Sequence, residues 1–434
     1  MGAKVAKFAA IRRDNPRFMS HEDDLLSRVQ TLRIEDYTYP LEFEQIAQSP
    51  RCPRESARLL VYDGQQMSDH LFYDLPTILP SGTRLTGNNT RVMHARLRAH
   101  TASGAGIELF LLEPSSPVDY EASLAQRTQC EWKCLVGNSK RWKGGLVRGS
   151  VGDSGTFTAE RISHGAESSS YIRFQWEGGA SFAEILDKAG SIPIPPYLKR
   201  EATPQDDEWY QTVYSSIGGS VAAPTAGLHF SESLLTALAE QGIPTSYLTL
   251  HVGAGTFLPV KSDTIGGHPM HHEVFSVDRT LLESLAASPT GPIAIGTTTL
   301  RTLESLYWLG VIAQDLNDDQ PLPSLDQWAP YQQPCPLTRA ESLGTLLRYL
   351  DIRGLDRLQA STSLLIAPGY RLRVARGLIT NFHQPQSTLL LLVAALVGDA
   401  WRTLYQHALD SGYQFLSYGD AMLILPDAVS SHAS

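Results

Sequence analysis

A change in the pattern of predicted strands and helices along the chain most constrains its fold. Between about residues 78 and 182, short alternating runs such as Arg91–Leu97, Ile107–Leu112 and Tyr171–Trp176 follow one another, separated by glycine-rich turns. Short strands in close succession, with no helix between them, predict a small β-barrel. On both sides of this segment strands alternate with helices, which is typical of an α/β domain.

We therefore predict an α/β fold in which a main, barrel-like α/β domain is interrupted by an inserted small β-barrel domain. The predicted limits are 1–30 for an N-terminal extension, 31–77 and 183–434 for the main domain, and 78–182 for the insert. The extension has mixed charge and no periodicity, so we expect it to be poorly ordered. Residues 313–337 are rich in Pro, Asp and Gln and predict a long surface loop.

The composition indicates the cellular context. The chain has 434 residues, 42% of them hydrophobic, which is enough for a substantial core. Four cysteines without a regular framework predict reduced thiols. The chain begins with no signal-peptide pattern, and its longest apolar run, Leu389–Val397, is too short to cross a bilayer. These features predict a soluble, cytoplasmic protein with no membrane partner.

The stretch Val221–Phe257 predicts a ligand site. Its pattern is that of a helix between two turns that are rich in Gly, Thr and His, followed by a strand and a further turn. His229 lies where the helix starts and His251 where the strand ends. In open α/β sheets ligands collect at this edge.

Four turns along the chain share one character. They are Thr225–His229, His251–Thr256, Gly296–Arg301 and Thr380–Ser387, and each combines a flexible backbone with hydroxyl or amide groups and a His or Arg. The turn Gly296–Arg301 opens a helix, so its free N–H groups suit a carboxylate or a phosphate. The residues alone thus predict a polar, anionic ligand.

Other chemistries find less support. The segment His268–Glu273 holds three histidines, but Pro269 prevents a helical ligand face, and His271 and His272 would point to opposite sides of an extended segment. No metal is expected here, and a catalytic, substrate-binding or structural role for the segment stays open. The chain contains no P-loop and no Gly-x-Ser-x-Gly elbow.

Charge is distributed unevenly along the chain. The net charge is −9, whereas residues 78–150 hold ten Lys and Arg against five Asp and Glu, a local balance of +5. A basic module on an acidic chain favours a polyanion-binding face, although a solvated charged surface gives the same balance.

Six blocks of the sequence occur in the same order in one known family. They are Ala223–Phe230, Thr249–Phe257, Gly296–Thr298 with Arg301–Ser305, Ala367–Tyr370, Leu378–His383 with Ser387–Leu390, and Ser417–Met422. On these blocks the chain resembles the S-adenosylmethionine:tRNA ribosyltransferase-isomerases of queuosine biosynthesis over about residues 32–425. The family's fold, an α/β domain interrupted by a β-barrel, agrees with the strands and helices that the sequence predicts.

The resemblance implies a reaction. Such an enzyme transfers and isomerises the ribosyl moiety of S-adenosylmethionine onto 7-aminomethyl-7-deazaguanine at the wobble position of a tRNA, giving epoxyqueuosine and releasing adenine and methionine. S-adenosylmethionine is then a co-substrate, and the tRNA that bears the deazaguanine is the partner. The amine of the deazaguanine is the nucleophile, so no further cofactor and no metal is expected.

The resemblance also implies roles for particular residues. The acid/base candidates are His229, His251, His383 and Asp420, because an imidazole titrates near working pH and a carboxylate is an alternative base. The candidates for binding S-adenosylmethionine are Thr225, Gly227, Gly253, Thr256, Thr297, Thr298, Arg301, Glu304, Asn381 and Ser387. The candidates for binding RNA are Arg91, Arg96, Lys140, Arg141, Trp142 and Lys143.

The chain departs from the family pattern mainly in the predicted barrel. Asn89 stands where the family usually has Asp, the loop Gly137–Lys143 differs in sequence, and the connection 310–360 is longer. The acceptor is therefore less defined than the donor, which leaves two alternatives: a paralogue that acts on another nucleobase or RNA, or a non-catalytic tRNA-binding module. The sequence leaves the oligomeric state open, a monomer included.

Overall fold

The main body of the protein is built on one large mixed sheet. The computed structural model describes residues 19–152, 155–165, 169–253, 260–332 and 337–426. From edge to edge, the nine strands are β16 (Arg357–Thr362), β14 (Glu273–Asp278), β13 (Thr245–Leu250), β3 (Leu85–Asn88), β15 (Ile293–Ile295), β17 (Gly377–Asn381), β18 (Ala421–Ile424), β1 (Arg58–Tyr62) and β2 (Met67–Leu71). The central run β13–β3–β15–β17 is parallel, so the carboxyl ends of these strands meet at one edge of the sheet.

This sheet is open, which differs from the barrel-like main domain that we predicted. In the described part of the chain no pairing joins β16 to β2. The edge strand β2 has the sequence Met-Ser-Asp-His-Leu, and its first three residues are exposed. Polar side chains on an edge discourage further strand pairing, which is the physical reason for an open sheet. The α/β class of the fold is confirmed.

The second unit is the predicted small β-barrel. Six strands form it, namely β5 (Arg96–His100), β6 (Gly106–Ser116), β7 (Gln129–Gly137), β10 (Ser169–Trp176), β9 (Thr156–His164) and β8 (Val147–Ser150). A pairing of His100 with Arg148 closes the ring between β5 and β8, and the short β11 (Gly190–Ser191) adds to β5. Its core contains Trp132, Phe157 and Phe174, together with Phe182 from α5 (Phe182–Ala189).

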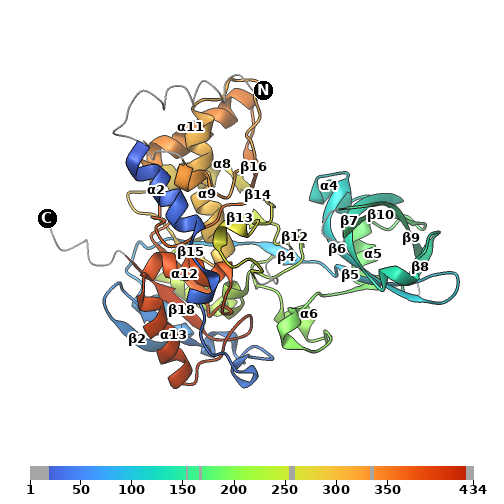
Figure 1. Cartoon of the computed structure of the whole chain (residues 1–434), viewed down its shortest axis with the longest axis horizontal. Coiled ribbons are helices and arrows are strands. Elements are labelled where there is room, and N and C mark those ends of the chain that lie inside the picture. Colours follow the sequence, from blue (N-terminus) through green and yellow to red (C-terminus); the bar gives the residue numbers. More distant parts are fainter. Residues whose placement is uncertain (1–18, 153–154, 166–168, 254–259, 333–336, 427–434) are drawn as a thin grey trace.

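A narrow neck joins the barrel to the body, and Figure 1 shows the two units side by side. The neck contains β4 (Thr90–Val92), which pairs in parallel with β12 (Ile217–Ser220). The insert starts later than the predicted residue 78, because β3 at Leu85–Asn88 already belongs to the large sheet. Burial explains this difference, since all four residues of β3 are buried in the body. The short helices α4 (Tyr120–Leu124) and α6 (Asp206–Trp209) lie close to the neck.

Helices cover the large sheet. They are α3 (Leu75–Ile78), α7 (Glu232–Glu240), α8 (Arg279–Ala287), α9 (Thr297–Ala313), α10 (Ala329–Gln332), α11 (Arg339–Arg353), α12 (Thr388–Val397) and α13 (Ala400–Asp410). The central helix α9 is buried from Thr297 to Gly310. Helix α11 approaches α9 closely at Gly310, where a Cβ atom would lie 2.2 Å from the carbonyl oxygen of Ser342.

The N-terminal segment differs from the extension that we predicted. Residues 1–18 lie outside the described part, but Met19–Gln30 forms helix α2. Val29 of α2 is buried in the core of the body, and Leu25 and Leu26 pack against that core. These apolar contacts give the helix a partner that local sequence does not show. Within the described residues, no single helix is long and apolar enough to span a membrane, and α12 with α13 meets the length and composition limits only as a pair bent by 113°.

Candidate active site

A cavity lies at the carboxyl ends of the central parallel strands. With its open mouth it encloses about 1290 Å³. All four turns that the sequence singled out contribute to its wall: the first through Thr225, the second through Val252, the third through Gly296–Arg301 and the fourth through Thr380–Ser387. Such an edge is where open α/β sheets bind ligands. The turns therefore form one site, although some 160 residues of chain separate the first from the last.

Helix α9 begins inside this cavity. Gly296 precedes it with a φ of +92°, in the region that glycine adopts without strain. The helix thus starts directly after β15 and presents Thr297 and Thr298 to the cavity. The Thr298 hydroxyl is buried and has no hydrogen-bond partner among the described residues. Free N–H groups at a helix start and a nearby hydroxyl together favour an anionic group.

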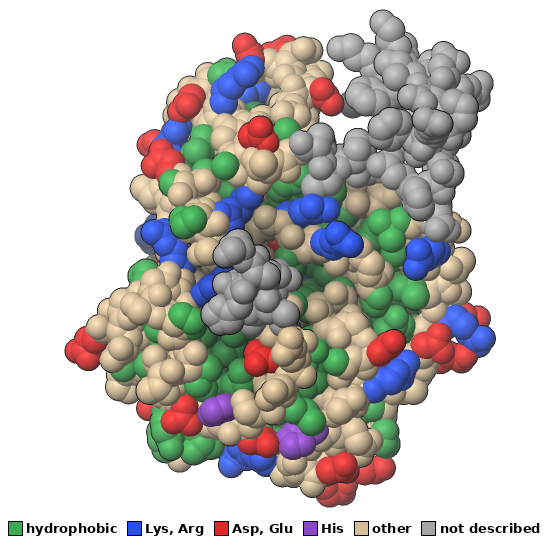
Figure 2. Space-filling view, turned by 90° about the vertical axis from the view of Figure 1, so that its left-hand side faces the viewer, with side chains coloured by type: hydrophobic (Ala, Val, Ile, Leu, Met, Phe, Trp, Pro, Cys, Tyr) green, Lys and Arg blue, Asp and Glu red, His purple; other side chains and the backbone are tan. Residues whose placement is uncertain are grey.

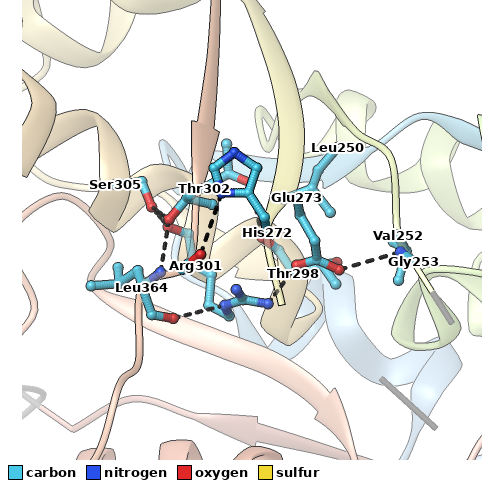
Figure 3. Close-up of polar contacts among 12 residues, drawn as sticks. Leu250, Val252, Gly253, His272, Glu273, Thr298, Arg301, Thr302, Ser305 and Leu364 are labelled. Atoms are coloured by element: carbon cyan, nitrogen blue, oxygen red, sulfur yellow. Dashed lines mark hydrogen bonds and ion pairs between the residues drawn. The ribbon is translucent and has the colours of Figure 1, made fainter. Parts of the chain in front are cut away.

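One turn further along α9, Arg301 forms a buried ion pair. Its Nη1 lies 2.6 Å from an Oε atom of Glu273, and both side chains are at most 6% exposed. Its Nε donates to the carbonyl oxygen of Leu364 at 3.1 Å, and Figure 3 shows the guanidinium held between these two acceptors. The remaining Nη2 is buried without a partner in the described part of the chain. Arg301 and Glu273 both line the cavity, so the ion pair forms part of its wall.

Asn381 connects two walls of the site. At the end of β17 its side chain accepts a hydrogen bond from Thr225 Oγ1 at 2.8 Å, and its Nδ2 lies 3.1 Å from Nε2 of His229. Thr225 and Asn381 line the cavity, whereas His229 lies behind them. Burial lowers the pKa of His229 to about 4, so its ring is neutral at pH 7 and accepts this bond. His229 therefore supports the wall through Asn381.

His383 is the acid/base candidate that lines the cavity. Its Nε2 lies 2.8 Å from the Thr380 hydroxyl, and its backbone is hydrogen-bonded to the hydroxyls of Tyr39 and Tyr405. Burial lowers the pKa of the imidazole to about 3, which keeps the ring neutral. Close by, Ser387 caps helix α12 by accepting from the N–H of Leu390.

Two predicted carboxylates lie elsewhere and have protein partners. Asp420 is fully buried, pairs with Arg51 and accepts from the backbone N–H groups of Arg58 and Gln414. Glu304 is also fully buried and accepts from the Tyr370 hydroxyl and from the backbone N–H groups of residues 373–375. Burial raises the pKa of Glu304. Neither Asp420 nor Glu304 is among the described residues that line the cavity. Each carboxylate instead accepts hydrogen bonds from backbone N–H groups of neighbouring segments.

The remaining predicted residues of the second turn lie at the neck or outside the described part. His251 stacks on Tyr120 of α4 with ring centroids 4.0 Å apart, so it joins the body to the barrel. Gly253 donates to Glu273 at 3.4 Å behind the wall. Thr256 is outside the described residues. In the first turn, a Cβ at Gly227 would lie 2.2 Å from the hydroxyl of Tyr214, so this glycine permits close packing.

The structure adds residues that the sequence argument left open. His268, Met270 and His271 line the cavity together with Glu273, and all four belong to the histidine-rich segment His268–Glu273. The density of polar side chains in this segment was the available signal. The four residues lie together in the wall because β14 begins at Glu273, next to the end of β13.

The predicted RNA-binding residues fall into two groups. Lys140, Arg141 and Lys143 are exposed on the β7–β8 connection, and Arg91 is exposed at the neck. Arg96 is partly buried near Glu108. Trp142 is only 3% exposed, donates to the carbonyl oxygen of Gly145 and packs under the Arg161 guanidinium. Its ring is part of the barrel core, so stacking on an RNA base was a wrong expectation for this tryptophan.

The fold and the cavity together define a class of protein. It is an α/β protein with an inserted β-barrel and a polar ligand site at the carboxyl ends of its parallel strands. The chain matches the family described as "Queuosine biosynthesis protein" over residues 34–424. It therefore belongs to this family.

Similar proteins carry one name. The chain is 40% identical to the S-adenosylmethionine:tRNA ribosyltransferase-isomerase of Gloeobacter violaceus over 399 residues, which covers 91% of this chain and 96% of the relative. It is 36% identical to the protein of the same name from Dechloromonas aromatica, with 91% and 97% covered. A crystal structure of an S-adenosylmethionine tRNA ribosyltransferase from Thermotoga maritima aligns with a TM-score of 0.43 and 25% identity, covering 90% of this chain and 100% of that one.

Proposed function

We propose that this protein is an S-adenosylmethionine-dependent tRNA ribosyltransferase-isomerase of queuosine biosynthesis. It transfers and isomerises the ribosyl moiety of S-adenosylmethionine onto 7-aminomethyl-7-deazaguanine at the tRNA wobble position, and it releases adenine and methionine. Family membership and the names of the relatives support this proposal. The observation that carries it is the buried Arg301 Nη2, which has no partner among the described residues and lies beside a helix start in the cavity wall.

In this proposal the start of α9 binds the methionine carboxylate of the donor. Thr297, Thr298 and Arg301 provide hydroxyl, backbone N–H and guanidinium donors on one wall. Because the Arg301 charge is already paired with Glu273, an incoming carboxylate would bind to the free edge of the guanidinium. Thr225, Asn381 and Ser387 face the donor from the other turns.

The proposed ribosyl transfer requires proton transfer but no nucleophile from the enzyme. The positive sulfur of S-adenosylmethionine acidifies the C–H bonds at ribose C5′, and the deazaguanine amine supplies the nucleophile. His383 contacts the bound donor from the cavity wall, while His229 acts through Asn381. The donor is a co-substrate, and the scheme needs no metal. Among the described residues, no group of three His, Cys, Asp or Glu side chains is placed to hold a metal ion.

The barrel is proposed to bind the tRNA. Lys140, Arg141 and Lys143 are exposed together on one connection, and the local charge of residues 78–150 is +5. Arg91 is exposed at the neck, and Arg96 is partly buried near Glu108. Basic side chains also lie across the middle of the face that the body turns away from the barrel, with acidic ones mainly around its edge (Figure 2). That face is the second candidate for RNA contact. A cytoplasmic location fits a tRNA substrate.

The decisive experiment combines purified protein, S-adenosylmethionine and tRNA bearing 7-aminomethyl-7-deazaguanine. We expect adenine and methionine to be released in step with epoxyqueuosine formation. Adenine release with another RNA, but not with this tRNA, would identify the divergent paralogue. Binding of tRNA without adenine release under any of these conditions would identify the non-catalytic module.

The donor site is tested by Arg301→Ala. A charge-assisted hydrogen bond contributes about 1.5–3 kcal/mol, so we expect the donor dissociation constant to rise about 10- to 150-fold by calorimetry. Arg353→Ala is the matched control, because Arg353 lies on α11 outside the cavity. Donor binding by Arg301→Ala at parental strength would contradict this assignment.

A further inference from the structure

The cavity wall contains two imidazoles that the proposed function does not yet use. His268 and His271 line the cavity, on the side formed by the segment that leads into β14. Within the described residues, neither ring nitrogen of His268 or His271 forms a hydrogen bond. Both rings are partly exposed. They are therefore free to accept a proton from a bound molecule.

The structure holds this segment in place at several points. The Gln327 side chain accepts from the Met270 N–H at 2.7 Å and donates to the His268 carbonyl oxygen at 3.1 Å. Glu273 at the other end is bound to Arg301. Between these anchors, His272 contacts Ser324 at 3.0 Å. A polar segment that is fixed from both ends and faces a cavity is built for a ligand rather than for core packing.

Strand geometry places His271 close to the proposed donor anchor. Successive side chains of an extended segment alternate between its two sides, and residues i and i+2 lie about 6.6 Å apart on the same side. His271 and Glu273 both line the cavity, and the preceding Met270 reaches it as well. Figure 3 shows the His272 ring on the other side, away from the Arg301 guanidinium. In S-adenosylmethionine the sulfonium is only a few bonds from the carboxylate, so ribose C5′ must lie within a short distance of Arg301.

We propose that His271 is the catalytic base that removes a proton from ribose C5′ of S-adenosylmethionine. This inference rests on the proposed function and deepens it. His383 is less suited, because its Nε2 is engaged with Thr380 and because burial lowers its pKa to about 3. His268 is the neighbour of His271, and both burial and the charge of His271 lower its pKa.

The step is balanced without an added co-reactant. The C5′–H bond breaks, its proton moves to a nitrogen of the His271 imidazole, and the electron pair stays on C5′ beside the positive sulfur. Departing adenine later needs one proton on nitrogen, and the His271 imidazolium can return the one that it accepted. The amine of the deazaguanine loses its own proton to solvent when it forms the new bond.

The experiment uses the full chain, the deazaguanine-bearing tRNA and a donor that carries deuterium at C5′. Two variants, His271→Gln and His271→Ala, are compared with the parent, and melting temperatures verify folding. We expect adenine release at saturating donor to fall about 100-fold or more, since general-base catalysis contributes at least that much. Loss of deuterium to solvent should fall in parallel, whereas donor binding by calorimetry stays at the parental value. Free imidazole in the buffer should restore part of the activity of His271→Ala.

Matched variants separate this inference from its alternatives. His407→Gln changes a histidine of α13 that does not line the cavity and should keep the parental rate. Parental rates in both His271 variants would overturn the inference, as would a loss confined to donor binding. It would also be overturned if His383→Gln, and not His271→Gln, abolished deuterium loss. If the parent itself releases no adenine with the correct tRNA, the proposed function fails instead.

Discussion

The ion pair of Glu273 with Arg301 makes a quantitative prediction about stability. Glu273→Gln keeps the shape of the side chain but removes its charge, which leaves a buried guanidinium without a counter-charge. Removing one partner of a buried pair lowers the free energy of unfolding by about 3–5 kcal/mol. Both side chains are at most 6% exposed, so little solvent screening reduces this value. Arg301 keeps its bond to the Leu364 carbonyl, which places the expected loss near the lower limit, at about 3 kcal/mol.

The assay is urea unfolding of the parent, Glu273→Gln, Arg301→Met and the double variant. The double variant has no unpaired buried charge and should recover most of the loss, because replacing both partners of a buried pair is often nearly neutral. Donor binding should weaken about 10- to 150-fold in both variants that lack Arg301. A loss below about 1 kcal/mol in Glu273→Gln, equal to that of an ordinary hydrogen bond, would show that the pair is not desolvated as described.

Four further outcomes are expected. Bonds from Arg200, Thr203 and Tyr418 outweigh the burial of Asp206 and hold its pKa at about 2, against an ordinary value of 3.8. A carboxyl whose pKa is lowered in the folded state stabilises the protein at neutral pH. Asp206→Asn should therefore lower the free energy of unfolding by about 2 kcal/mol at pH 7. The difference in stability between the variant and the parent should fade as the pH drops from 3.8 towards 2. Gly310→Ala should destabilise by about 1–3 kcal/mol in thermal unfolding, since its Cβ has no room against α11. Trp142→Ala should lower barrel stability by about 3–5 kcal/mol, as for a buried aromatic residue, rather than act on RNA through lost base stacking. Lys140→Glu with Arg141→Glu should weaken tRNA binding and flatten its salt dependence without changing donor binding, and unchanged tRNA affinity across a salt titration would place the RNA on another face.

Much of the architecture could be predicted because it depends on short-range patterns. The strand-dense segment predicted the barrel, and helix–strand alternation predicted the α/β body. The glycine at 296 and the threonines after it marked the start of α9. The four polar turns could be expected to meet, since loops that follow parallel strands lie at one edge of a sheet. The edge was predictable, but the orientation of each side chain at that edge was not.

The roles of several residues depended on partners far away in the sequence. Asp420 binds Arg51, which is 369 residues distant, and Glu304 binds the backbone beyond Tyr370. The sequence around Trp142 is typical of an exposed loop, whereas in the fold Arg161 and Gly145 enclose the indole ring. No local pattern distinguishes a carboxylate that faces a ligand from one that binds its own backbone.

The class of fold, the inserted barrel, the site edge and the family could be predicted from local patterns, because periodicity, turn residues and ordered motifs act over a few neighbouring residues. The open sheet, and the arrangement in which His268 and His271 line the cavity while His229 lies behind its wall, became evident only in the folded chain. Burial and charge pairing depend on which distant segments pack together. For that reason the residues of the site were identifiable by type, while their division into ligand-facing and supporting groups required the folded chain.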